Sequence, residues 1–280
     1  MQGILNNMKL FAVTISVVLL AASLPVAAQN SVHPELDSKY SMNLGMFFPE
    51  REIQLQAGLT TPGTRDSVSG AELGFDKHDN LFAIDFKWRF GEKWSLAAQY
   101  FDASASATKF LDDDVEWNDL VFSSGTNIDA ETEFALYRVV IGRSFAKTDN
   151  VDFGFGAGIH WLDIRAALAG SILVNNTVTF RRENVSSSAP LPNIGAWYDY
   201  SLSPRWALKA RADWFKASVD EYDGRLVNFQ AGINYSWFKY GGIGVAYNHF
   251  EFDAGISAPN WQGAADLTFK GPFVFIDIYW

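Results

Sequence analysis

Strict alternation between apolar residues and other residues constrains the fold of this chain more than any other feature. In residues 82–90, FAIDFKWRF, phenylalanine, isoleucine and tryptophan occupy every even position, while the charged residues all stand at odd positions. The same pattern recurs in residues 151–161, 193–202, 206–215 and 226–237. Successive side chains of an extended chain point to opposite faces, so a period of two residues predicts that each of these segments is a β-strand.

The connections between the predicted strands alternate between short and long. Short, turn-like connections stand at 91–93, 147–150, 203–204 and 239–241, and long polar stretches stand at 49–79, 108–130, 167–189 and 257–264, with 222–224 as a short exception. Tight turns at one end and longer loops at the other are typical of an up-and-down barrel. The sequence therefore predicts an all-β fold, a closed antiparallel up-and-down transmembrane β-barrel.

We count ten strands in this barrel, an even number that places both chain ends on the side of the short turns. They are predicted at 40–48, 80–90, 94–103, 133–145, 151–164, 193–202, 206–218, 226–237, 242–252 and 267–280. Twelve strands or eight are the alternatives, twelve because EIQLQAGL in the stretch 49–79 alternates as well. We expect Pro49 instead to kink a long first strand. Near Gly271-Pro272 the last strand changes the parity of its apolar residues, which predicts a bulge or the bilayer edge.

A membrane barrel is favoured over a soluble sandwich of two sheets, which would alternate as well. One face of the strands is wholly apolar over about ten positions, with Trp and Tyr at the segment ends, as in the aromatic girdles of membrane barrels. The strand length also matches a tilted bilayer crossing of about 9–11 residues. With 32 acidic residues against 22 basic ones, the chain is not suited to bind nucleic acid, and the lack of cysteine excludes disulfides and thiolate chemistry.

The N-terminal residues have the layout of a cleaved secretory signal peptide. Lys9 precedes an apolar run over residues 10–22, and the small-residue site 26–28 predicts cleavage after Ala28. Met8 is an alternative start, since the signal is well formed from there. We expect three parts: a signal peptide at 1–28, a periplasmic N-terminal stub at 29–39, and an outer-membrane barrel with long extracellular loops at 40–280.

The chain ends in GPFVFIDIYW, an alternating strand with an aromatic last residue. Over residues 40–280 the chain resembles Gram-negative outer-membrane β-barrel proteins, a general small-barrel class within which no subfamily is identified. The resemblance implies that Ile276, Ile278 and Trp280 form a terminal signal read by the barrel-insertion machinery, although phenylalanine is the commoner last residue. It also implies export to the outer membrane and contacts with periplasmic chaperones, outer-membrane lipids and lipopolysaccharide.

The predicted lumen face collects ionisable side chains of both signs. They are Asp85, Lys87, Arg89, Arg138, His160, Asp199, Lys209, Arg211, Asp213 and Asp277. These residues fit either an ion-selective pore or a plug of paired charges. A narrow barrel leaves little free interior, and Trp197, Phe215, Phe273 and Phe275 also point inward, so we favour the plug. In a plug, Arg211 is expected to contact Asp85, Asp199 or Asp213.

Other motifs were weighed as binding or catalytic sites. His249, Glu251 and Asp253 share one strand face and could hold a metal, but they are expected to mark where the strand leaves the bilayer. The run 112–114 of three aspartates is expected to be a solvated loop.

Two enzyme classes built on this architecture do not fit. Omptin proteases use Asp-x-Asp followed by Asp-x-His, but here the two spacings, at 112–114 and 76–78, stand in reverse order. Lipid A deacylases carry His-x-Ser, and the residue two after His249 is a glutamate. We therefore expect no catalytic, metal or cofactor site and a non-enzymatic protein. Its expected role is structural, adhesive or ligand-binding through surface loops, with an extracellular ligand that the sequence does not identify. A narrow porin-like channel is the first alternative, and a lipid-A-modifying or protease-type barrel enzyme is the second.

Overall fold

The computed structural model describes residues 32–58, 68–69, 75–76, 80–112, 114–117, 120–174, 177–220, 222–258 and 261–280. The predicted signal peptide lies outside the described residues. Within these ranges, no helix is long and apolar enough to cross a membrane.

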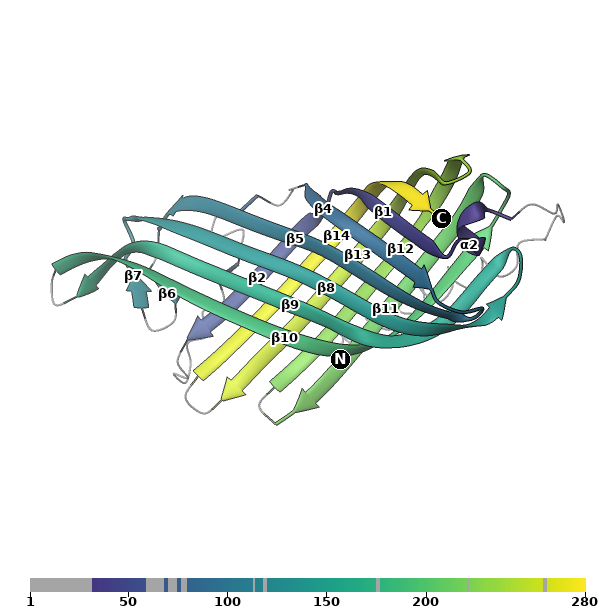
Figure 1. Ribbon diagram of the computed structural model, residues 1–280. Helices are drawn as coiled ribbons and strands as arrows, with labels where there is room; N and C mark the ends of the chain where they lie inside the picture. Colours follow the sequence, from purple (N-terminus) through teal and green to yellow (C-terminus); the bar gives the residue numbers. More distant parts are fainter. Residues whose placement is uncertain are drawn as a thin grey trace, which may run out of the picture. The chain divides into compact units, whose positions relative to one another are not determined.

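Ten antiparallel strands form a closed ring (Figure 1). In spatial order they are β1 (Tyr40–Phe47), β4 (Leu81–Arg89), β5 (Trp94–Phe110), β8 (Asn127–Lys147), β9 (Val151–Val174), β10 (Thr177–Ser201), β11 (Trp206–Val219), β12 (Tyr222–Phe238), β13 (Gly241–Ala258) and β14 (Trp261–Tyr279). Pairing of β1 with β14 closes the ring, from Ser41 opposite Tyr279 to Phe47 opposite Phe273. The predicted closed barrel of ten strands is confirmed.

The described residues between β1 and β4 add no crossing to the ring. Strand β2 (Glu50–Gly58) pairs with β14, and Glu50 stands opposite Lys270 in the same register that places Phe47 opposite Phe273. β1 and β2 are therefore one long strand interrupted at Phe48 and Pro49, as expected for a proline that cannot donate to the ladder. A two-residue strand, β3 (Val68–Ser69), pairs with β2.

Two of the stretches expected as long loops, 167–189 and 257–264, are largely paired strand, and this corrects the prediction. β9 and β10 form a hairpin that pairs from Thr177 and Val174 down to Tyr200 and Val151. β13 and β14 likewise pair up to Ala258 and Trp261, and β5 and β8 up to Phe110 and Asn127. Beyond the apolar band the outward face becomes polar, so the alternation fades although the hydrogen-bonded ladder continues. A short hairpin of β6 (Val115–Trp117) and β7 (Leu120–Phe122) follows β5.

The bulge that the parity change near Gly271-Pro272 predicted is not formed. The register between β13 and β14 runs without a shift from Gly241 opposite Ile278 to Ala258 opposite Trp261. Leu267, Phe269 and Phe273 are all buried on the inner face. The apolar residues near Gly271 therefore mark an apolar layer inside the barrel, which a pattern of outward residues does not anticipate.

We call the end of the barrel with the short turns the proximal end and the opposite end the distal end. At the distal end the ring opens into two sheets, which can be followed in Figure 1. β10 pairs with β11 only from Ile194 to Ser201, although both strands continue distally. On the other side, β4 begins at Leu81, so β5 continues past it. One distal sheet contains β5, β8, β9 and β10, and the other contains β11 to β14 and β2.

Two prolines account for the end of pairing between β10 and β11. The N–H of Ser201 donates to Asn150 on the β9 side, and the N–H of Leu202 donates to Trp206 on the β11 side. Because strand N–H groups alternate in direction, even-numbered residues of β10 face β11. Pro190 and Pro192 are even-numbered and lack the N–H that β11 would need, so the ladder stops next to them.

The seam between β10 and β11 opens only where lipid contact ends. Ile194 and Trp214 face outward and are the last paired residues, whereas Lys216 and Ser218, the next outward positions of β11, are polar. An open strand edge inside hydrocarbon would leave backbone groups without partners, so it is tolerated only outside the bilayer. The closed part of the ring therefore coincides with the apolar outer band.

Candidate functional site

A short N-terminal helix closes the proximal end of the lumen. The helix α2 (Pro34–Asp37) is preceded by His33, which caps it, and the His33 N–H donates to Ser201 Oγ at 2.8 Å. The Glu35 carboxylate forms an ion pair with Lys209 and accepts a hydrogen bond from Asn234 Nδ2 at 3.0 Å. The segment expected as an N-terminal stub thus contributes a docked plug from residue 33 onward.

Two backbone carbonyls of this N-terminal segment are also held by cations of the barrel. Lys147 Nζ donates to the carbonyl of Leu36 at 2.6 Å, and Arg89 Nη1 donates to the carbonyl of Ser38 at 2.8 Å. Sequence reasoning missed this plug because a four-residue helix carries too little pattern to reveal it. The signal available was the PELD motif, a proline and two acidic residues at a helix start.

Two titratable groups of the plug have shifted pKa values. Burial lowers the pKa of His33, and the Glu35 carboxylate opposes this shift only in part. Burial alone would raise the pKa of Glu35, but the ammonium of Lys209 beside it outweighs burial and leaves the pKa lowered. Neutral His33 and ionised Glu35 are therefore the forms that the docked plug favours.

Acid is expected to loosen the plug. Because the folded pKa of His33 is depressed, its contribution to docking is present above the ordinary value of about 6.5 and is lost as the pH falls toward the folded pKa. Hydrogen exchange at the amides of residues 35–38, corrected for intrinsic rates, should therefore accelerate between about pH 7.5 and about pH 5. His33→Asn keeps a capping acceptor and does not titrate, so its exchange should vary less with pH. Equal protection of the wild type across this range would contradict the prediction.

A layer of paired charges, which we call the charged layer, fills the lumen above the plug. Its most enclosed pair joins Arg138 and Asp213 through two hydrogen bonds of 2.7 Å each. Both side chains are buried, and Asn193 Nδ2 adds a third hydrogen bond to Asp213 at 3.2 Å. Such bidentate geometry is the arrangement in which a buried ion pair is best satisfied.

The remaining predicted lumen charges also have partners across the barrel. Lys87 contacts Asp199 at 2.9 Å, and Arg211 contacts Asp85 at 3.2 Å, one of the three acidic neighbours expected for it. Neighbouring amides join them, because Gln230 accepts from Arg211 and donates to Asp85. These contacts connect strands that are far apart in the sequence.

One acidic residue central to this network was not among the predicted site residues. Asp152 is buried and accepts from Arg89 at 2.9 Å, from Ser144 at 2.6 Å and from Trp197 Nε1 at 3.1 Å. Its position opposite the apolar face of residues 151–161 was the available signal. Asp152 supplies the acidic partner of Arg89, which the ten predicted residues do not include.

His160 and Asp277, the last of the predicted lumen residues, are placed at different heights. His160 lies against Asn228 at 3.3 Å beside the Arg138 pair, whereas Asp277 accepts from Asn234 at 2.8 Å beside the plug. All ten predicted residues therefore lie inside the barrel. The three residues of the predicted insertion signal lie on the outside or at the end of β14, and Ile276 and Trp280 are more than half exposed.

A small chamber remains within the charged layer. It has a volume of about 90 Å³, and Lys87, Arg138, Arg211, Asp85 and Asp199 are among its lining residues. This volume corresponds to about three water molecules at roughly 30 Å³ each. The space left inside the charged layer is therefore small.

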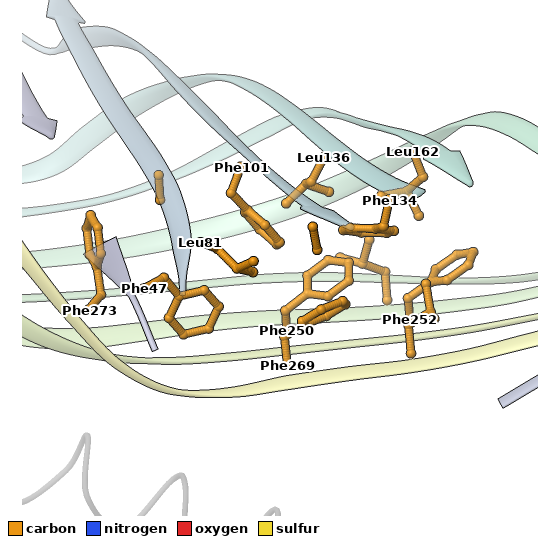
Figure 2. Packing of buried hydrophobic residues seen from close by; sticks show 14 of the residues in the cluster. Phe47, Leu81, Phe101, Phe134, Leu136, Leu162, Phe250, Phe252, Phe269 and Phe273 are labelled. Carbon is orange, nitrogen blue, oxygen red and sulfur yellow. The ribbon is translucent and has the colours of Figure 1, made fainter. Parts of the chain in front are cut away.

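An apolar layer closes the lumen on the distal side of the charged layer. Along β8, Arg138 in the charged layer is followed distally by Leu136 and Phe134 in this apolar layer. The rings of Phe134 and Phe269 stack at 5.2 Å, and Phe101 and Phe250 pack on them, as Figure 2 shows. Each of these four side chains is at most 5 % exposed, so the layer is a packed core rather than a lined channel.

A second apolar cluster covers the inner face of the first distal sheet. It joins Trp117 and Phe122 of the β6–β7 hairpin to Ile128, Leu168 and Ile172 of β8 and β9. The hairpin thus supplies the cover that β8 and β9 need after they extend past the ring. Val185 of β10, and Ile53 and Ala265 of the second distal sheet, pack against this cluster.

The other sequence motifs do not assemble into a site in the described part of the chain. Arg225 pairs with Glu251 at 2.9 Å and with Asp253 at 3.1 Å, so these carboxylates are engaged with a cation. Asp114 accepts from the N–H of Ser124 in a local turn. Asp113 and His78 lie outside the described residues. Within the described ranges, no three histidine or acidic side chains are grouped to hold a metal.

Comparisons with known proteins identify the fold but not a family. No family model and no curated protein matches the sequence. The outer-membrane protease OmpT of Escherichia coli matches with a TM-score of 0.54, covering 91% of this chain and 100% of that one at 10% identity. The fold is that of a Gram-negative outer-membrane β-barrel.

Two further solved barrels align at lower scores. OprG of Pseudomonas aeruginosa has a TM-score of 0.38 at 8% identity, covering 89% of this chain and 98% of that one. Ail, the attachment invasion locus protein of Yersinia pestis, has a TM-score of 0.29 at 10% identity, covering 84% and 98%. At this level of identity the OmpT match describes the shared outer-membrane barrel architecture alone.

Proposed function

We propose that this protein is a non-enzymatic, non-conducting outer-membrane barrel that binds a ligand outside the cell between its two distal sheets. The observation that carries the proposal is the apolar layer around Phe134 and Phe269, which blocks the lumen and leaves the distal surface as the place for function. The charged layer then acts as a structural plug, and ligand binding belongs to the extended strands.

Three barriers in series argue against conduction. The α2 plug occupies the proximal end, the paired charges occupy the middle, and the buried aromatic rings occupy the distal part of the ring. Ions would have to pass through a packed apolar layer, where desolvation is costly. The channel alternative therefore requires several side chains and the plug to move together.

The distal sheets offer accessible inner surface beside the β10–β11 seam. Inward-facing residues near the seam are only partly buried, as Val185 and Phe215 are, and Ser187 is exposed. By contrast, the inward residues of the closed ring are largely buried. The open seam between β10 and β11, flanked by two hydrogen-bonded sheets, suits the binding of an extended or flat ligand.

Electrical recording tests the non-conducting part of this proposal. Wild-type protein in a planar lipid bilayer should give no discrete current steps above the baseline of lipid alone, because the apolar layer excludes water. A known open porin reconstituted in the same lipid serves as the positive control. Regular current steps that depend on the amount of this protein would overturn the non-conducting assignment and support the channel alternative.

Thiol labelling tests whether the β10–β11 seam faces the outside. The chain has no cysteine, so single cysteines can be placed without background. Ser187→Cys beside the seam should react with a membrane-impermeant thiol reagent on intact cells, and Thr148→Cys in a short turn should not. Labelling of Thr148→Cys alone would invert the orientation and contradict extracellular binding.

A further inference from the structure

The distal half of β10 presents a long strand edge beside the open seam. From Thr177 to Asn193 the strand pairs with β9 on one side, and no other described strand pairs with its second side. Free strand edges attract other strands, and proteins commonly guard them with proline, lysine or bulges. Here Pro190 and Pro192 guard only the proximal end of this edge, and the register with β9 continues without a bulge.

This side of β10 carries backbone N–H and C=O groups that no described strand pairs with. The alternation established at Ser201 and Leu202 directs the N–H and C=O groups of even-numbered residues away from β9. Residues 182, 184, 186 and 188 are arginine, asparagine and two serines, and all four side chains are exposed. A second strand at the usual spacing could therefore pair along this stretch without displacing a core side chain.

Two apolar side chains of β10 are exposed at positions too far from the apolar band to contact lipid. Val178 is 67% exposed and Phe180 is 66% exposed, and both face outward on β10. They lie roughly 45–55 Å along the strand from Ile194, the last paired residue of the apolar band, at about 3.3 Å per residue. Apolar residues so far beyond the band are explained if side chains of an added strand pack across them.

We propose that an extended polypeptide segment of another protein binds this protein by adding a strand to β10, along the side of its even-numbered residues 178–188 that no described strand pairs with. Backbone hydrogen bonds to the even-numbered residues supply affinity, and apolar side chains placed opposite Val178 and Phe180 supply selectivity. This inference rests on the proposed extracellular binding role and specifies its ligand class. A peptide is the occupant that the edge favours, because a strand satisfies a row of alternating donors and acceptors.

The test uses a displayed library of random twelve-residue peptides, selected on wild-type protein in lipid nanodiscs against empty nanodiscs and an unrelated barrel. Enriched peptides are then synthesised and titrated against two matched variants. The double variant Ser186→Pro/Ser188→Pro removes two backbone N–H donors that point away from β9. It spares the ladder with β9, as the native prolines at 190 and 192 do. Ser186→Ala with Ser188→Ala removes the same side chains and keeps the donors.

The proline pair should weaken peptide binding about tenfold or more, and the alanine pair should leave it within about twofold. Heat-modified gel mobility should show that both variants are folded. Hydrogen exchange should slow at the amides of residues 184, 186 and 188 when the peptide is added. The amides of the odd-numbered residues, which pair with β9, should change little.

Three results would overturn strand addition. One is that no peptide is enriched on the wild type, and another is that enriched peptides bind both variant pairs equally or protect other amides. In either case, the labelling and conductance experiments still test the proposed extracellular binding role independently. The third is protection of the even-numbered amides by self-association without peptide, which would make the occupant a second copy of this chain.

Discussion

Arg138→Ala is expected to lower the free energy of unfolding by about 3–5 kcal/mol, because it leaves the buried Asp213 carboxylate without its partner. The pair is enclosed on both sides, with Arg138 at 6% and Asp213 at 1% exposure, and its hydrogen bonds are 2.7 Å long. Reversible urea unfolding in lipid vesicles measures the change. A loss of stability of this size would show that the pair is desolvated, as the plug interpretation of the charged layer requires.

Arg165→Ala provides the matched control on the distal surface. Arg165 contacts Glu133 at 3.4 Å, and both side chains are well exposed at 72% and 65%. Exposed pairs contribute about 0–1 kcal/mol, so this variant should unfold close to the wild type. If Arg138→Ala were equally mild and instead produced ion-selective currents, the charged layer would be a hydrated pore and the plug interpretation would be wrong.

Phe269→Ala is the second large effect we expect, with a loss of about 3–5 kcal/mol in the free energy of unfolding. Phe269 is fully buried at 0% exposure and packs against Phe134, Phe101 and Phe250. Removing its ring loses both the transfer free energy and the contacts around the cavity left behind. The same unfolding assay measures it.

Phe180→Ala makes the identical chemical change at a surface position. Phe180 is 66% exposed on the distal part of β10, so its removal should change the unfolding free energy by about 0.5 kcal/mol or less. A comparable loss from both variants would show that the layer around Phe269 is not a packed core. The conductance of Phe269→Ala should stay at baseline, because the plug and the charged layer remain.

The inward and outward faces of the strands were readable from the sequence. Period two is a local property of extended backbone, so residues such as Arg138 and Val139 on β8 are sorted to opposite faces wherever the strand lies in the ring. The outward apolar band also indicated a membrane barrel before any contact was known. The ten ring strands follow from the same local pattern, and the interruption between β1 and β2 follows from Pro49.

Strand length was less predictable, since its signal disappears where lipid contact ends. In residues 177–189 the outward face is polar apart from Val178 and Phe180, and the segment was expected to be a loop. The ladder with β9 nevertheless continues, held by backbone hydrogen bonds that the side-chain pattern does not encode. Pro190 and Pro192 were visible in the sequence, but their effect on the seam depends on which neighbour their missing N–H groups face.

The sequence by itself determined the ten ring strands, their faces and ten of the ionisable side chains of the lumen, because each of these depends on near neighbours in the chain. Only the tertiary structure decided which charges meet, as Arg138 and Asp213 do across the barrel, and that Glu35 returns to Lys209. It also decided that the ring separates into two sheets beyond the apolar band. Those outcomes depend on barrel closure and strand register, which bring distant residues together at heights that no local pattern specifies.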